Sequence, residues 1–429
     1  MVNQLKRELG VTGAVLMGLG SIIGTGIFVS VGIGAGVAGP SVIAAIVLAG
    51  LLAVCNGLSS AQLAASHPVS GGTYEYGYRY LNKRLGFTAG WLFLLAKSAS
   101  AAAAALGFSG YLLSALNLDG NLRVPLAVGA VAALTLIILG GIRRSNRLNA
   151  AIVTLTLLGL SAFIAGGVLK VDARNFSPFF TAQADSGFSA LLQATALMFV
   201  AFTGYGRIAT MGEEVREPLR TIPHAIIIAL LATTGLYSAV ALISIGLIGA
   251  PTLAAAVESS AAPLQAAAHA AGLFFVEQLV AISAITAMLG VLLNLILGLS
   301  RVLLAMGRRG DMPPAAARLN NAGTAPTIAV VTVGAVVSLL ALTNSVWATW
   351  SFSAFTVLLY YAITNLAALK LPLEKRLFPR AIAWAGLGSC LFIAFWVEPM
   401  IWLLGLSLVA IGLLWQTFAQ RRWRTAATP

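Results

Sequence analysis

The residue types that most often carry chemistry are sparse and scattered in this chain. Its three histidines, His67, His224 and His269, stand far apart in the sequence, and so do its two cysteines, Cys55 and Cys390. No spacing among them matches a metal site or a disulfide framework, and the chain has no Walker-type phosphate loop and no haem-attachment motif. We therefore expect no cofactor, no bound metal and no enzymatic nucleophile–base pair.

Glycine gives the more informative pattern, at two places. In residues 18–36 (GLGSIIGTGIFVSVGIGAG) glycines crowd the middle of an apolar stretch, and in residues 199–212 (FVAFTGYGRIATMG) two more fall at the corresponding depth. Each glycine destabilises a helix interior by about 1 kcal/mol relative to alanine. One such cluster alone is equally compatible with helix packing, since Gly20 and Gly24 form a GxxxG pair. Two matched clusters instead favour two broken helices, which form the binding site at mid-membrane in many secondary transporters.

The composition places these glycines inside a membrane protein. Of the 429 residues, 59% are hydrophobic and only 9% are charged, and the mean hydropathy is +0.93. A soluble domain carries about 25% charged residues. A helix needs about 20 apolar residues to cross the hydrocarbon core of a bilayer. We predict twelve such spans, at residues 11–34, 41–65, 86–113, 124–140, 148–169, 188–211, 223–249, 272–304, 326–343, 346–368, 381–397 and 399–419.

The net charge of +13 follows from where the basic residues lie, and it needs no nucleic-acid partner. Of the 26 Lys and Arg residues, 21 fall in the segments on one side of the predicted spans, whereas Arg123, Lys170 and Arg174 fall in the opposite segments. Because such a bias marks the cytoplasmic side, we expect an integral protein of the cell (inner) membrane with cytoplasmic termini, residues 1–10 and 421–429. The first span lacks a cleavage site, so we expect it to be retained.

The position of the two glycine clusters predicts the internal organisation. They fall in the first and sixth spans, as a five-plus-five inverted repeat requires. The repeat halves are predicted at residues 11–169 and 188–368, and two further helices within residues 369–420 lie outside the repeat. No connection between the spans is long enough to form a hydrophilic domain, and the longest are polar, among them residues 250–271. We therefore expect the protein to act within the bilayer as a carrier, a channel or an intramembrane enzyme.

Five segments, in this order, resemble motifs of the amino acid–polyamine–organocation family of permeases. They are GSIIGTGIF (20–28), PVSGGTYEY (68–76), GIRRSNRLN (141–149), FVAFTGYGRIATMGEEVREPLRTIP (199–223) and SRVLLAMGRRGDMP (300–313). The resemblance runs from the first to the tenth predicted helix. It implies a LeuT-type fold and amino acid transport by alternating access.

The resemblance also implies which residues bind the substrate. A half-helix that begins mid-membrane presents its N–H groups and positive dipole end to a carboxylate, and unwound carbonyls at the end of another half-helix accept from an ammonium. By this resemblance, the residues that bind the substrate carboxylate are four residues of the first span, Ile23, Gly24, Thr25 and Gly26. The ammonium role passes to the carbonyls of Phe199, Val200 and Phe202, while Thr203 and Tyr205 face the pocket or its gate.

The chain departs from the family pattern in a way that bears on the substrate. Many members have an acidic residue directly after the Gly-aromatic pair of the sixth helix, where this chain has Gly206 followed by Arg207. No other Asp or Glu lies mid-span, and a buried ammonium without a partner costs several kcal/mol. We therefore expect neutral amino acids as substrates. The alternatives are a cationic amino acid or polyamine exchanger and, less favoured, a channel.

Lys97 is the candidate for energy coupling. Some proton-driven members carry a lysine on the fifth helix, at a place that corresponds to Thr156 here. Lys97 lies mid-span on the third helix, where a charged lysine costs about 2.5–3.5 kcal/mol to insert. We interpret it either as a proton carrier or pocket cation, or as a structural lysine bonded to carbonyls of a broken helix. Coupling to sodium through Ser283, Thr286 and carbonyls of the first helix is the other possibility, and exchange is a third.

The segments that flank the spans on the basic side receive structural interpretations. Alternating tyrosines at positions 74, 76, 78 and 80 predict an interfacial helix or aromatic belt after the second span. Arg301, Arg308 and Arg309 match residues that anchor a helix end at anionic headgroups.

Overall fold

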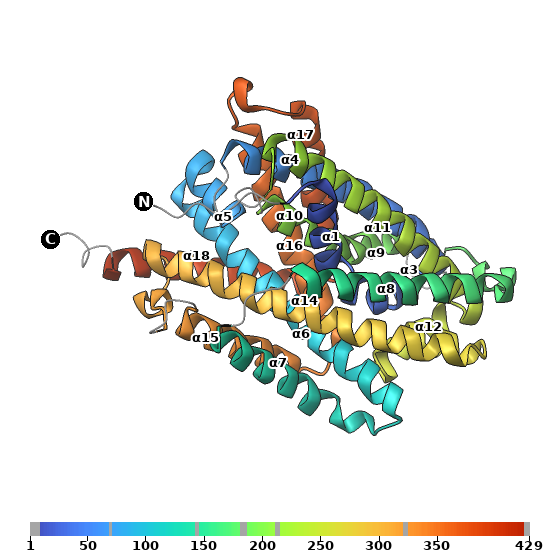
Figure 1. Cartoon of the computed structure of the whole chain (residues 1–429). Helices are drawn as coiled ribbons and strands as arrows, with labels where there is room; N and C mark the ends of the chain where they lie inside the picture. The colour runs from blue at the N-terminus through green and yellow to red at the C-terminus, as the bar shows by residue number, and fades with distance from the viewer. Residues whose placement is uncertain are drawn as a thin grey trace.

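The computed structural model describes residues 9–67, 71–141, 146–180, 187–210, 215–320 and 325–423. Within them the chain forms one bundle of helices (Figure 1), and the β-structure described is an isolated bridge between Leu9 and Val215. The prediction of an all-α polytopic membrane protein is therefore confirmed.

Every predicted span is occupied by helix. The first span holds α1 (Val11–Ile22), α2 (Thr25–Phe28) and α3 (Ser30–Ala38), and the sixth holds α9 (Gly187–Phe202) and α10 (Gly206–Ala209). The other spans hold α4 (Val42–Ser66), α6 (Lys83–Leu116), α7 (Arg123–Leu139), α8 (Asn146–Gly167), α11 (Pro218–Ile248), α14 (Phe274–Arg309), α15 (Thr327–Ala341), α16 (Val346–Leu369), α17 (Arg380–Ala394) and α18 (Pro399–Trp423). Among the described residues, nine helical runs are long and apolar enough to cross a membrane, and three shorter apolar helices accompany them.

Both interruptions expected from the glycines are present, and they differ in kind. α1 ends at Ile22, Ile23 is extended with φ −79° and ψ 111°, and α2 starts after Gly24. The second interruption is milder, because α9 passes into a single 3₁₀ turn, η6 (Thr203–Tyr205), before α10 begins. Only the first interruption therefore contains fully extended backbone.

The polar connection predicted over residues 250–271, between α11 and α14, is largely helical. It contains α12 (Ala250–Ser259) and α13 (Pro263–Ala270), each with a proline in its first turn, where a missing N–H costs nothing. The two helices pack closely on α3. A Cβ placed on Gly32 would lie 3.2 Å from both the Leu253 carbonyl oxygen and the Pro263 Cβ. They cover one end of the bundle.

The two ends of the bundle differ in charge. The end at which α6 begins and at which α14, α16 and α18 finish carries Lys83, Arg309, Lys370 and Arg421, and we call it the basic end. The opposite end, where α7 begins, is covered by α12 and α13. There Arg123 donates to the Asn344 side chain at 2.8 Å and to the Glu258 carbonyl. Between the ends, α6 packs along both α14 and α16 and forms the centre of the bundle.

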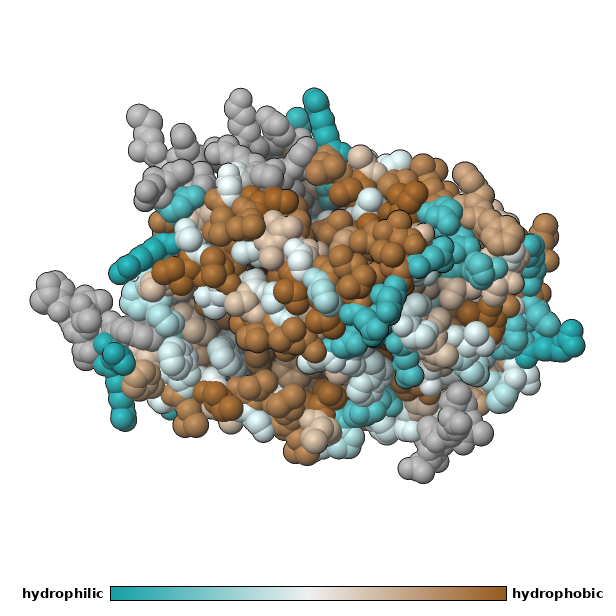
Figure 2. Space-filling view, turned by 90° about the horizontal axis from the view of Figure 1, so that it is seen from below, coloured by the Kyte–Doolittle hydropathy of each residue, from teal (hydrophilic) through white to brown (hydrophobic). Residues whose placement is uncertain are grey.

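The outer surface is apolar along much of the bundle (Figure 2). Large hydrophobic side chains stay exposed on the outward faces of α7, α15 and α18, including Leu136, Leu339 and Leu414. In a soluble protein such wide apolar patches would cause aggregation. Here they are the surface that contacts lipid, as expected for an integral membrane protein.

Candidate functional site

A cavity of about 1500 Å³ extends from the two helix interruptions to the basic end. Its inner part is lined from the interruptions by Ser21, Ile22, Thr25, Gly26, Val200, Ala201, Thr203 and Gly204, from α6 by Phe93, Lys97 and Ser100, and from α16 by Trp350, Tyr360 and Tyr361. Its mouth is lined by Glu75, Arg301, Arg308 and Arg309. The described residues that line the cavity include none from α12 or α13, so the cavity is open at the basic end and closed at the other.

The two interruptions touch each other because Gly204 has no side chain. A Cβ on Gly204 would overlap the carbonyl oxygen of Ser21, and it would lie 2.6 Å from the backbone nitrogen of Ile22. These are backbone atoms, which cannot rotate away as a side chain can. The glycine of the second interruption therefore sets how closely α9 approaches the first.

Tyrosine hydroxyls donate hydrogen bonds to backbone carbonyls at both interruptions. The Tyr237 hydroxyl on α11 donates to the Ile22 carbonyl at 2.9 Å and lies 3.4 Å from the Ala201 carbonyl, so it bridges both interruptions. The Tyr361 hydroxyl on α16 donates to the carbonyl of Thr203 at 3.3 Å. Because buried carbonyls need a partner, these contacts stabilise the broken conformation within an apolar core.

The first turn of α2 offers free donors to the cavity. The first N–H groups of a helix have no partner inside it, which leaves those of Thr25 and Gly26 available. The Thr25 hydroxyl is also buried, lines the cavity, and has no hydrogen-bond partner among the described residues. This is a cluster of donors at a positive helix end, the arrangement that binds a carboxylate.

Lys97 points into the cavity at the depth of the second interruption. Its ammonium donates to the Thr203 hydroxyl at 2.7 Å, and that hydroxyl donates to the Val200 carbonyl at 2.7 Å. The lysine is 9% exposed. Among the described cavity-lining residues the one carboxylate is that of Glu75, at the mouth. Lys97 thus brings a positive group to the broken helix without an acidic partner from the described lining.

The structure separates the ten predicted site residues into two groups. Thr25, Gly26, Val200, Thr203 and Lys97 line the cavity, whereas Ile23, Gly24, Phe199, Phe202 and Tyr205 are buried behind its wall. The aromatic members of the second group pack on the tyrosines that hold the interruptions. The ring centroids of Phe202 and Tyr237 are 5.2 Å apart, and those of Tyr205 and Tyr361 are 5.3 Å apart.

Several cavity residues escaped the sequence analysis, above all those of α16. Trp350, Tyr360 and Tyr361 lie in an apolar span without a glycine interruption, so no local pattern distinguishes them from core residues. The one available signal was that α16 carries Ser351, Ser353, Thr356, Thr364 and Asn365, an unusual number of polar residues for a span. All five are buried, which marks α16 as an inner helix.

The hydroxyls considered for sodium donate to backbone carbonyls, which fixes their hydrogens and leaves their oxygen lone pairs able to face a cation. Ser283 donates to the Leu155 carbonyl at 3.1 Å, and Thr286 donates to the Ile282 carbonyl of its own helix at 2.9 Å. Thr156 likewise donates to the Ile152 carbonyl. No three His, Cys, Asp or Glu side chains of the described residues come together as a metal site would require.

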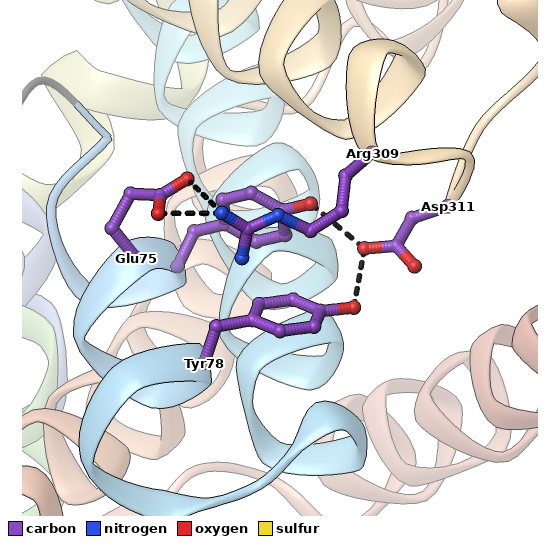
Figure 3. A network of polar contacts seen from close by, with 5 residues as sticks. Glu75, Tyr78, Arg309 and Asp311 are labelled. Carbon is purple, nitrogen blue, oxygen red and sulfur yellow. Dashed lines mark hydrogen bonds and ion pairs between the residues drawn. The ribbon is translucent and has the colours of Figure 1, made fainter.

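The mouth of the cavity holds a polar network that joins the segment after α4 to the end of α14 (Figure 3). This segment contains α5 (Thr73–Tyr76) and the π-helical turn η2 (Gly77–Leu81), where an interfacial helix was expected. One amino group of Arg309 contacts both carboxylate oxygens of Glu75, at 2.9 and 2.7 Å. The guanidinium also stacks 4.1 Å from the ring centroid of Tyr78. Arg309 is therefore not the headgroup anchor that we expected.

Asp311 fixes the aromatic part of this network. The hydroxyls of Tyr74 and Tyr78 donate to its Oδ2 atom at 2.7 and 2.6 Å, distances typical of a hydroxyl bonded to a carboxylate. Burial, and then the charge of Asp311, raises the pKa of the Tyr74 phenol well above its usual range, so this hydroxyl stays a donor. Asp311 itself is fully buried, and its backbone carbonyl accepts from the Trp415 indole at 3.1 Å.

A polytopic bundle in which two interrupted helices face a cavity open at one end defines a membrane carrier. Comparison with known proteins gives the family. The sequence model of a family described as amino acid permease matches residues 9–422, so this chain belongs to the amino acid permease family. The resemblance found in the motifs is thereby confirmed. The protein is a membrane amino acid transporter and not an enzyme.

Individual relatives share most of the chain. An uncharacterized transporter of Mycobacterium tuberculosis is 42% identical over 92% of this chain and 87% of its own. The branched-chain amino acid permease BcaP of Bacillus subtilis is 33% identical over 79% of this chain and 75% of its own. A chloroplastic cationic amino acid transporter of Arabidopsis thaliana is 31% identical over 74% of this chain and 58% of its own.

Proposed function

We propose that this protein is a secondary active transporter that moves neutral amino acids across the cell membrane by alternating access, coupled to protons or to exchange. The observation that carries the proposal is the cavity itself. It reaches both helix interruptions, and at that depth its described lining contains Lys97 and no carboxylate.

The backbone of the substrate would bind at the interruptions. Its carboxylate meets the N–H groups of Thr25 and Gly26 and the Thr25 hydroxyl, with Ile23 and Gly24 as the extended link that aims them. Of the three α9 carbonyls predicted to hold its ammonium, that of Val200 lines the cavity and already accepts from Thr203, whereas those of Phe199 and Phe202 belong to residues behind the wall. Thr203 and Tyr205 complete this wall. The sites on α2 and α9 are the counterparts expected of an inverted repeat with halves 11–169 and 188–368.

Lys97 favours a neutral substrate side chain. A lysine or arginine side chain at this depth would find no carboxylate partner in the described lining, and an unpaired buried cation costs several kcal/mol, so it would bind poorly. Val200, Phe93 and Trp350 add apolar surface to the same cavity. Of the two named relatives with a stated substrate, the branched-chain permease of Bacillus subtilis matches this lining better than the cationic transporter of Arabidopsis.

The charge asymmetry of the bundle suggests the membrane orientation. The cavity opens at the basic end, and basic residues gather on the cytoplasmic side of membrane proteins. We infer on this ground that both termini are cytoplasmic and that the described conformation is inward-open, with α12 and α13 as the closed outer gate. The helices within residues 369–420 then flank the repeat.

A thermal-shift screen of the purified transporter against the twenty amino acids tests this function. A ligand that binds only the folded state stabilises it by about 2.7 kcal/mol at 100 times its dissociation constant. We expect upward shifts with neutral amino acids and none with lysine, arginine or a polyamine. Shifts confined to cationic ligands would replace the proposal with the exchanger. Uptake into liposomes that does not saturate would indicate a channel.

Lys97→Met tests proton coupling. If one proton moves with each substrate, wild-type accumulation rises about tenfold per unit of imposed pH difference, because one pH unit corresponds to about 1.4 kcal/mol. We expect the variant, which lacks the amine, to lose this dependence when liposome uptake is measured over a series of imposed pH differences. Replacing sodium by choline in the same assay should change nothing.

The matched control is Lys170→Met. Lys170 is exposed at the end opposite the mouth, where its amine donates to the Ala271 carbonyl, and we expect the wild-type pH profile. An unchanged pH profile in Lys97→Met would remove Lys97 from the coupling step. Wild-type accumulation that requires preloaded amino acid instead of a pH difference would identify an exchanger.

A further inference from the structure

The inner end of the cavity is formed by a tryptophan. Trp350 lies near the start of α16, which begins at the closed end of the bundle and runs toward the basic end. It lines the cavity although only 3% of its surface is exposed. The other aromatic residues that α16 contributes to the lining, Tyr360 and Tyr361, lie about 15 Å nearer the mouth by the helical rise of 1.5 Å per residue. Trp350 is thus the deepest lining residue of α16.

The indole is held in one orientation by the second broken helix. Its N–H donates to the Leu197 carbonyl at 2.9 Å. Leu197 lies one turn before Val200 and Ala201, which line the cavity at the interruption. One turn after the tryptophan, Ser353 is 2.7 Å from Ser100 of α6, another cavity residue. The indole N–H bond thus orients the ring against α9, while the serine pair holds the next turn of α16 against α6.

A fixed ring at this place limits what the cavity can hold. The interruptions bind the charged groups shared by all amino acids, so discrimination between them must come from the space left for the side chain. Beyond Trp350 no described residue of α12 or α13 contributes to the lining, so the indole closes that space toward the outer end.

We propose that Trp350 is the specificity-determining residue that sets the largest side chain this transporter accepts. The inference rests on the proposed function. It assigns the choice among neutral amino acids to an aromatic wall on α16, separate from the backbone groups of α2 and α9 that select for an amino acid as such.

Competition with a size series tests the proposal. Alanine, valine, leucine, phenylalanine and tryptophan compete with a labelled neutral amino acid for uptake by wild type, Trp350→Leu and Trp350→Phe. One methylene more or fewer in a hydrophobic pocket changes the preference between two substrates by about 10–200-fold. We expect Trp350→Leu to improve phenylalanine and tryptophan relative to alanine by at least about tenfold. Trp350→Phe keeps a ring but loses the N–H donor, and should shift the ratio less.

The matched control is Trp91→Leu. Trp91 also donates its indole N–H to a carbonyl, that of Leu408 at 2.8 Å, but it does not line the cavity. This variant should keep the wild-type ranking. An equal loss for all five competitors in Trp350→Leu, or the same change of ranking in Trp91→Leu, overturns the inference while leaving the transporter function standing. If the wild-type protein takes up none of the five amino acids, both the inference about Trp350 and the proposed function are overturned.

Discussion

Gly204→Ala is expected to reduce uptake on the order of 100-fold, because misplacing a binding group by about 1 Å has effects of that size. The new methyl group would overlap the Ser21 carbonyl oxygen and crowd the Ile22 nitrogen. Neither atom can move without shifting the end of α1, whose Ile22 carbonyl is held by Tyr237. The substitution therefore pushes the two interruptions apart. Saturable uptake into liposomes is the measurement.

The matched control for this substitution is Gly235→Ala on α11. A Cβ at Gly235 meets no atom within 4 Å, and alanine stabilises a helix interior by about 1 kcal/mol relative to glycine. We expect normal uptake and equal or higher thermal stability. Size-exclusion profiles of both variants must show folded protein. Wild-type uptake by folded Gly204→Ala would mean that the close approach of the interruptions is not needed for transport.

The spans and the interruptions were predictable because their signals are local. Span length follows from the thickness of the hydrocarbon layer, and glycine clusters locate helix breaks within a few residues. The difference between the two interruptions was not predictable. A glycine segment can become extended, as at Ile23 and Gly24, or tighten to a 3₁₀ turn, as at Thr203–Tyr205. The choice involves contacts from distant parts of the chain, among them tyrosine hydroxyls of α11 and α16 that donate to carbonyls of the two segments.

The half of the predicted site that lies behind the cavity wall has a similar explanation. Motif resemblance identifies which segment forms the site, but the direction in which each side chain points depends on its neighbours. Phe202 and Tyr205 flank Gly204 and Phe199 lies one turn earlier, and nothing in the segment tells whether a ring faces the cavity or packs against another helix. In the structure all three pack on tyrosines of α11 and α16.

Lys97 shows what sequence reasoning could and could not do for a single residue. Its rarity inside a span was enough to select it as a candidate. Its partner was not predictable, because Thr203 is 106 positions away in the chain. The structure agrees with part of each interpretation, the lysine in the pocket and the lysine bonded to a broken helix. The lysine contacts a broken helix, through a hydroxyl and not through a bare carbonyl, and it also lines the cavity.

The network at the mouth could not be read from the sequence at all. Glu75, Arg309 and Asp311 look like ordinary charged residues of polar connections, and the segments that carry them are more than 200 positions apart. Their pairing depends on the packing of α5 against α6 and α16 and on the sharp end of α14, where Gly310 adopts a positive φ of 77°. It follows that a charged residue at a helix end is a poor guide to lipid contact unless its partners are known.

Asp311→Ala is expected to lower the free energy of unfolding by about 2–6 kcal/mol. The substitution leaves the hydroxyls of Tyr74 and Tyr78 without their acceptor, and each unsatisfied buried group costs about 1–3 kcal/mol. Asp311→Asn should cost less, because its amide keeps an acceptor oxygen for the two phenols. Its amino group would occupy the position of Oδ1, which is buried and has no partner among the described residues. Thermal unfolding of the purified variants gives the comparison.

Asp119→Ala is the matched control, because Asp119 is exposed at the opposite end and its carboxylate bonds locally, to Asn121, within the described part of the chain. Its melting temperature should equal that of the wild type. The order wild type, Asp311→Asn, Asp311→Ala is the decisive result, since it separates the loss of an acceptor from the loss of a charge. If both Asp311 variants unfold at the same lowered temperature, the charge beside Arg309 and not the acceptor holds the mouth together. If neither is destabilised, the network does not fix α5 to the end of α14.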